Sequence, residues 1–133
     1  MALADLRPGL TGSIAVTVEE RHTAHAQGHT GVHVLATPTL ILFCEMASDQ
    51  AIKHAYGPGD SSVGLHNDIW HLAAARPGET VTIDAELTAI EGRKLSFAVR
   101  GTVRGDALAR GIHERVWVDL ARFLARLEQN STA

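Results

Sequence analysis

The 133-residue sequence contains a single cysteine, Cys44, and aromatic residues make up only 5% of it. One cysteine can form neither an intrachain disulfide nor a thiolate cage for a metal ion. A basic excess is also missing, because 12 Lys and Arg residues stand against 15 Asp and Glu residues and give a net charge of −3. Nucleic-acid-binding proteins usually carry a basic excess, so no nucleic-acid partner is expected.

Long apolar segments are absent as well. The longest fully apolar run, Leu40 to Cys44, is far too short to span a bilayer. The first nine residues lack the basic start and apolar stretch of a secretory signal. We therefore expect a cytoplasmic protein with no membrane partner. Hydrophobic residues still form 45% of the chain, which suffices for one core, and the length favours a single domain over residues 1–133.

The clearest predicted element is a helix that begins near residue 37. Thr37 is suited to cap its first turn, and Pro38 suits the position that follows. The run from Leu40 to Cys44 is apolar on every side, which is typical of a helix buried all round. Gly57-Pro58-Gly59 would end the helix.

Alternating apolar and polar residues predict strands on both sides of this helix. Two of them form a long antiparallel hairpin with one wet face, which turns around Glu91-Gly92-Arg93. A short closing helix, capped by Asp119, follows the last strand. The strand after the long helix should present Val63, Leu65, Ile69 and His71 on one face. The predicted strands are residues 14–18, 63–71, 80–89, 95–103 and 107–118.

One long apolar helix needs cover on most sides, and a strongly curved sheet wrapped around it provides that cover. The sequence therefore predicts an α+β protein with a curved antiparallel sheet around one central helix, which is the arrangement of a hot dog fold. Such a sheet keeps an exposed edge. Pairing that edge with a second copy of the chain makes at least a homodimer, or a higher oligomer, the expected state.

Glu45 is the most informative polar residue, because it directly follows the apolar run of the helix and lies near Ile41 and Ile52 on a helical wheel. Burying a carboxylate is costly without partners, so a carboxylate in this setting suggests a general base or a nucleophile. The alternative is that Glu45 begins the exposed end of the helix together with Asp49, since structural ion pairs also use carboxylates.

Three further candidates each have a structural alternative. Thr37 could place its hydroxyl at the positive end of the helix, where a substrate carbonyl could lie, or could simply cap the helix. His71 should lie on the strand face that meets the helix, where a buried histidine is more often structural than catalytic. Gly64 would let a backbone N–H approach a ligand closely, or would mark a bulge in the sheet.

Four histidines between His22 and His33 lie three or four residues apart, a spacing that would suit a metal site on a helix. Gly28 and Gly31 argue against a stable helix in this stretch, so we expect a solvated flap and no metal ion. Arg115, on the last predicted strand, could contact a phosphate or a carboxylate, or pair with an acidic side chain.

Several segments together match a known pattern. Residues 34–38, followed by Glu45, resemble the beginning of the central helix in the fluoroacetyl-CoA thioesterase-like family of hot dog acyl-CoA thioesterases. Residues 62–72, read Ser-Val-Gly-Leu-His-Asn-Asp-Ile-Trp-His-Leu, resemble the "vG-x-H-x-D-x-x-HL" strand of that family. Residues 78–81 and 111–115 extend the match, so the resemblance covers nearly the whole chain.

The resemblance implies that an acyl-CoA thioester is hydrolysed to the free acid and CoA by a homodimer with active sites at the subunit interface. The catalytic Thr, Glu and His of the family would correspond to Thr37, Glu45 and His71. Its strand glycine would correspond to Gly64 and its last-strand arginine to Arg115. CoA is then part of the substrate, and no separate cofactor is implied.

The sequence departs from the family ahead of the helix. Residues 27–33 contain none of the aromatic residues that help to form a lid in fluoroacetate-specific members. We therefore expect a more general thioesterase for short or medium acyl-CoA esters. In this hypothesis Glu45 acts as nucleophile or general base, and His71 orients or protonates. Thr37 positions Glu45, water or substrate, Gly64 donates its N–H to the oxyanion, and Arg115 orders the site or holds a phosphate.

Two other functions stay open from the sequence. A non-catalytic hot dog protein that binds or senses acyl-CoA would bind CoA esters without turnover. A hot dog hydratase would use an Asp-x4-His pair, and the only such spacing runs from Asp49 to His54. That pair falls on the polar end of the predicted helix, where a solvated face is the simpler interpretation.

Overall fold

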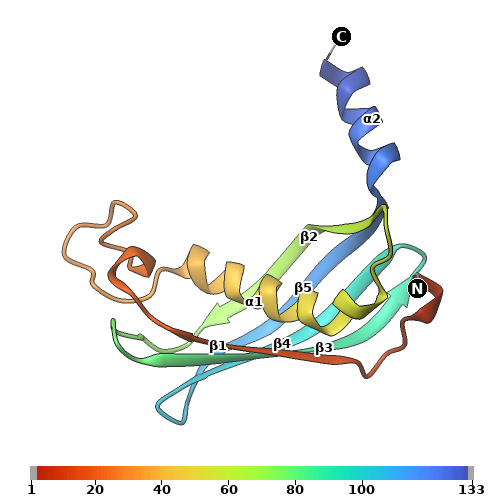
Figure 1. Cartoon of the computed structure of the whole chain (residues 1–133). Coiled ribbons are helices and arrows are strands. Elements are labelled where there is room, and N and C mark those ends of the chain that lie inside the picture. The colour runs from red at the N-terminus through yellow and green to blue at the C-terminus, as the bar shows by residue number, and fades with distance from the viewer. Residues whose placement is uncertain (1–2, 132–133) are drawn as a thin grey trace.

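The computed structural model describes residues 3–131 and consists of a five-stranded sheet, one long helix against it and a second helix at its end (Figure 1). Short 3-10 turns lie at Leu3–Asp5, Glu20–His22 and Lys53–Ala55. The main elements are β1 (Thr11–Thr17), α1 (Thr37–Ile52), β2 (Asp60–His71), β3 (Thr80–Glu91), β4 (Lys94–Val103), β5 (Asp106–Asp119) and α2 (Leu120–Ser131).

All neighbouring strands of the sheet are antiparallel, and their order is β1-β3-β4-β5-β2. The strands curve around α1, which lies across one face of the sheet (Figure 1). This arrangement confirms the predicted α+β hot dog architecture. The edges of the sheet are β1 and β2, so the strand that follows the helix in the sequence has one side without a partner strand in the chain.

The start of α1 differs from the prediction by one residue. Ala36, not Thr37, is the N-cap, with an extended backbone, and Thr37 is already the first helical residue. Pro38 occupies the first turn, where its missing N–H costs nothing. The Thr37 hydroxyl makes no capping bond and is therefore available to another partner.

The packing of α1 against the sheet is closest at β1. A methyl group at Gly12 would collide with the backbone oxygen of Ala47, so only glycine lets the strand and helix backbones approach this closely. The helix ends at Ile52 and continues as the 3-10 turn before Gly57. The fully buried side chains around α1 include Leu40, Ile52, Ile83, Leu87, Leu95 and Phe97.

A β-bulge interrupts the pairing of β2 with β5 between Gly64 and His66. Gly64 lies opposite Arg115, whereas Asn67, beyond the bulge, lies opposite His113. One extra residue in a strand reverses which side chains face the helix. The predicted shared face is therefore wrong, since two of its four residues come before His66 and two after it: Val63, Leu65, Ile69 and His71.

The second helix, α2, directly follows the last strand, as predicted. It points away from the sheet at the end of β5 (Figure 1), and its Leu120, Leu124 and Leu127 are exposed. The predicted cap is confirmed, because Asp119 Oδ1 accepts a hydrogen bond from the Arg122 N–H at 3.0 Å. None of the described helices has the length and apolar character that crossing a membrane requires.

The histidine-rich segment before α1 is irregular, as predicted. The rings of His25 and His33 stack with centroids 4.1 Å apart, and His33 Nδ1 lies 2.7 Å from a carboxylate oxygen of Glu20. Within residues 3–131 no group of three or more His, Cys, Asp or Glu side chains is arranged to hold a metal ion. This segment folds over the beginning of α1, where Gln27 hydrogen-bonds Thr39.

Candidate active site

Glu45 lies between α1 and the strands β2 and β5. A methyl group at Gly64 would lie only 2.8 Å from the Glu45 Oε2, so the carboxylate fills the space that the missing side chain leaves. The same oxygen is 3.9 Å from Arg115 Nη1 and 4.0 Å from His113 Nε2. The side chain is 30% exposed, so the carboxylate is held by neighbours and remains accessible from one side.

The guanidinium group of Arg115 is fixed by three hydrogen bonds. Its Nε donates to Ser62 Oγ at 2.8 Å, and its Nη2 donates to the Ser62 carbonyl oxygen at 3.0 Å. Its Nη1 donates to His113 Nε2 at 3.2 Å. These bonds hold the planar group in one orientation beside Glu45. The Arg115 side chain therefore loses little conformational entropy when a ligand binds at Glu45.

His113 is fully buried and hydrogen-bonds Arg115. Its Nδ1 lies 2.8 Å from Asn67 Oδ1 and 3.2 Å from the His66 carbonyl oxygen. Both partners are acceptors, so Nδ1 carries the proton and Nε2 offers its lone pair to Arg115. Burial, reinforced by the charge of Arg115, lowers the pKa of His113 to about 4, which keeps the imidazole neutral at neutral pH.

The network continues from Arg115 away from Glu45. Ser62 Oγ lies 2.5 Å from the Tyr56 hydroxyl, which donates to Asp49 Oδ1 at 2.8 Å. Asp49 is thus engaged with Tyr56, and His54 is exposed in the 3-10 turn after the helix. The two residues considered for a hydratase therefore have different surroundings, because Asp49 is bonded to Tyr56 and His54 is exposed to solvent.

Thr37 and His71 form a second polar pair at the first turn of α1. Thr37 Oγ1 lies 2.8 Å from His71 Nδ1. Burial lowers the pKa of His71, and a backbone contact with Ala73 partly opposes this shift. The threonine hydroxyl, free of any capping bond, therefore orients a neutral imidazole at the last residue of β2.

The five residues predicted for the site thus fall into two groups within one chain. Glu45 lies with Gly64 and Arg115, and Thr37 lies with His71. Thr37 and Glu45 are eight residues apart on α1, about 12 Å along the helix axis. Gly64 and His71 are seven residues apart on β2, on the order of 20 Å of strand. No hydrogen bond or ion pair joins Glu45 to Thr37 or to His71 in the described chain.

Sequence reasoning missed His113 as a member of the site. The signal was present in the alternation of β5, which puts His113, Arg115 and Trp117 on one side of the strand, where His113 and Trp117 are buried. A histidine on that side, two residues from an arginine, has to meet the same neighbours. Asn67 was missed for a different reason, since the bulge in β2 moves it to the inner face.

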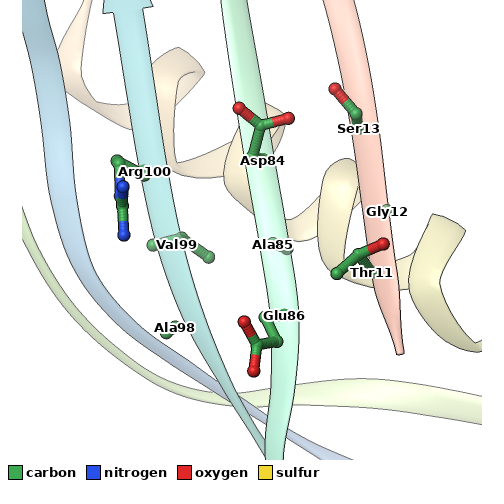
Figure 2. Close-up of a pocket in the computed structure, with 9 residues that line it drawn as sticks. All are labelled: Thr11, Gly12, Ser13, Asp84, Ala85, Glu86, Ala98, Val99 and Arg100. Carbon is green, nitrogen blue, oxygen red and sulfur yellow. The ribbon is translucent and has the colours of Figure 1, made fainter. Parts of the chain in front are cut away.

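A hollow on the outer face of the sheet is a separate feature. It measures about 570 Å³ and lies over β1, β3 and β4, on the face of the sheet opposite α1 (Figure 2). Figure 2 shows Asp84, Glu86 and Arg100 standing on this face, which is the predicted wet face of the hairpin. None of the five predicted site residues lines it.

Comparisons with known proteins identify relatives of most of the chain. Residues 18–121 match the family described as fluoroacetyl-CoA-specific thioesterase. A fluoroacetyl-CoA thioesterase from Streptantibioticus cattleyicolor is 37% identical over 100 residues, which cover 75% of this chain and 72% of that protein.

Solved structures agree with these matches. A variant of the fluoroacetyl-CoA-specific thioesterase has a TM-score of 0.87 at 30% identity and covers 94% of this chain and 97% of its own. A Thermus thermophilus protein described as a thioesterase superfamily member has a TM-score of 0.90 at 23% identity, with 98% and 96% covered. The second similarity concerns the fold alone, and the first extends to the sequence.

Proposed function

The chain belongs to the fluoroacetyl-CoA-specific thioesterase family, and from this membership we propose that it hydrolyses a short or medium acyl-CoA thioester to the free acid and CoA. Membership confirms the resemblance drawn from the sequence and the class of thioester hydrolase. The observation that supports a reactive site in this particular chain is the Glu45 carboxylate, held against Gly64 beside the fixed guanidinium of Arg115.

In the proposed reaction Glu45 acts on the thioester carbonyl. As a nucleophile, its oxygen bonds to the acyl carbon, the carbon–sulfur bond breaks and the CoA thiolate leaves and takes up a proton. Water then cleaves the resulting anhydride and returns the carboxylate. As a general base, Glu45 instead takes a proton from a water molecule that attacks the same carbon. The ion pair with Arg115 holds the carboxylate in place for either role.

We propose that Thr37 and His71 complete the site from a second copy of the chain. Within one protomer they are too far from Glu45 to share a substrate carbonyl with it, as the helix and strand spacings indicate. The edge strand β2 carries exposed apolar side chains, with Leu65 56% and Trp70 64% exposed. A homodimer formed along this edge would cover these side chains and bring the imidazole of one protomer to the carboxylate of its partner.

The acyl group has a candidate place beside Thr37. A hollow of about 390 Å³ lies between the histidine-rich segment and the start of α1, where Val32, Ala36 and Pro38 form part of its wall. No aromatic side chain closes it, because residues 27–33 contain none. We therefore propose a short or medium acyl chain and not a selectivity for fluoroacetyl-CoA.

A panel of acyl-CoA esters with detection of the released thiol tests the activity. The wild type should release CoA from short or medium esters, and Glu45→Ala should abolish release. Glu45→Gln keeps the size of the side chain and serves as the matched variant. Binding of CoA esters without thiol release from any of them would instead support the non-catalytic acyl-CoA binder.

Isotope labelling separates the two roles of Glu45. A single turnover in ¹⁸O-labelled water should place label in the Glu45 carboxylate if that group is the nucleophile. Label found only in the free acid is expected for the general base and also for an anhydride that water opens at its acyl carbon, so a trapping experiment decides between these two cases. Trapping an acyl group on Glu45 by rapid quenching would support the nucleophile independently.

Mixing two inactive variants tests the shared site. If Glu45 and His71 act across the interface, subunit exchange between Glu45→Gln and His71→Ala dimers creates heterodimers with one intact site each. A statistical mixture should then recover about a quarter of the wild-type activity. A mixture that stays inactive after exchange places both residues in the same protomer and contradicts the interface proposal.

A further inference from the structure

A second hollow lies at the junction of β5 and α2, and arginines surround it. Its volume is about 270 Å³, and its floor is formed by the end of β5 with Trp117 almost fully buried. Phe123, half-exposed on α2, forms part of the wall. The guanidinium groups that line it belong to Arg93 at the β3–β4 turn and to Arg122 and Arg126 on α2.

The charge of this hollow is opposite to that of the whole chain. Three arginines line it against a single carboxylate, Asp119, which already caps α2, while the chain carries a net charge of −3. Among residues 3–131 no ion pair is formed by the side chains of these three arginines. Arg122 and Arg126 are also four residues apart on one helix, a spacing at which like charges repel. Such a cluster is suited to a ligand with several negative charges.

The hollow and the candidate active site lie along the same strand, β5. Arg115, which contacts Glu45, is four residues before Asp119 at the edge of the hollow, about 13 Å along the strand. A ligand that reaches from Glu45 to this hollow must be long, with a reactive group at one end and negative charges at the other. Acyl-CoA has this form, because the pantetheine arm separates its thioester from a 3′-phosphorylated adenosine diphosphate.

We propose that this hollow binds the nucleotide end of CoA, with the phosphates on Arg93, Arg122 and Arg126 and the adenine against Phe123. Guanidinium groups bind phosphates with paired N–H donors, and an aromatic ring offers a stacking surface to a base. The site assigned here rests on the proposed thioesterase function. The proposed site also gives a function to α2, which projects from the sheet and carries two of the three arginines.

Two substrates that share one thioester test the proposal. An acyl-CoA carries the nucleotide, whereas the same acyl group on pantetheine lacks it. The double variant Arg122→Ala/Arg126→Ala should raise the KM for the acyl-CoA about tenfold or more and leave kcat/KM for the pantetheine thioester unchanged. The variant should also lose most of the dependence of this KM on salt concentration, because fewer ion pairs are formed. Alanine favours a helix, so α2 should remain folded.

Arg100→Ala is the matched control, because Arg100 is an exposed arginine on the opposite face of the sheet. It should leave both substrates unaffected. An equal loss on both substrates in the double variant, or no change on either, overturns the nucleotide site. If the wild type hydrolyses neither substrate, the thioesterase proposal fails, and calorimetric titration with CoA still decides the site: CoA binding that the double variant does not weaken overturns it.

Discussion

Replacing Gly64 by alanine separates the catalytic role of this position from its role in folding. The added methyl group would lie 2.8 Å from Glu45 Oε2, 3.6 Å from Glu45 Cδ and 3.8 Å from His113 Cε1. Only the first of these distances is too short. The atom that must move is the end of a flexible side chain, so the strand can keep its place while the carboxylate shifts.

The expected change in stability is small. Alanine restricts the unfolded chain, which stabilises the fold by about 0.4–1 kcal/mol at a position with compatible backbone angles. The displaced carboxylate loses part of its contact with Arg115, a partly exposed pair worth roughly 1 kcal/mol or less. These effects have opposite signs, so the unfolding free energy of Gly64→Ala should stay within about 1 kcal/mol of the wild type.

The expected change in activity is large. A reacting group displaced by about 1 Å can lose roughly 100-fold in rate. Relieving the contact at Gly64 requires a shift of several tenths of an ångström, so kcat/KM for an acyl-CoA ester should fall about 10- to 100-fold. Denaturant unfolding and thiol release, measured on the same preparation, give the two quantities.

Gly12→Ala is the matched control for this substitution. Its methyl group would meet the backbone of α1 at Ala47 and Ala51, which cannot move aside. That variant should lose about 2 kcal/mol or more of unfolding free energy. If Gly64→Ala instead keeps full activity, the position of the Glu45 carboxylate does not matter to the reaction, and the reasoning behind the site is refuted.

Three further outcomes follow from the polar contacts. His113→Leu should lower the unfolding free energy by about 1–3 kcal/mol in denaturant titrations, because it leaves Asn67 and Arg115 without a buried partner. The pKa of His113 is about 4 in the folded protein and 6.5 ordinarily, so on acidification the imidazole is protonated in the unfolded chain before it is protonated in the folded one. The unfolding free energy should therefore fall between pH 6.5 and about 4, by at most about 3 kcal/mol, and the fall should be smaller in His113→Leu. Thr37→Val should reduce kcat much more than Thr37→Ser, which keeps a hydroxyl for His71, while both variants unfold within about 1 kcal/mol of the wild type.

The local patterns of the sequence predicted most elements of the fold correctly. The apolar run Leu40 to Cys44 forms part of a helix, as predicted, but the prediction that this helix is buried all round is wrong for the single chain, because Leu42 is 51% and Met46 43% exposed. The alternation of the hairpin produces β3 and β4 with one wet face. Those patterns depend on residues close together in the chain. The bulge beside Gly64 is fixed by the pairing of β2 with β5, so the sequence offered it only as one of two interpretations of the glycine.

The sequence predicted five members of the candidate site but neither His113, Asn67 nor the grouping of the residues. Family resemblance supplied Thr37, Glu45 and His71, but a motif records spacing in the sequence and carries no distance between a helix and a strand. The structure groups Thr37 with His71 and Glu45 with Arg115. A single chain cannot supply the surface that would join them, so this part of the geometry had no signal in the sequence.

A neutral histidine beside Arg115 is favoured for a physical reason. A second positive charge at His113 would repel the guanidinium and would leave a buried group without enough solvation. The neutral ring instead accepts a hydrogen bond from Arg115 at Nε2 and donates one from Nδ1 to Asn67 Oδ1. The fully buried imidazole therefore carries no charge. The opposite charges of Arg115 and Glu45, whose side chains are 12% and 30% exposed, then compensate each other. The counter-charge of the Glu45 carboxylate is therefore held in position by groups that add no charge of their own.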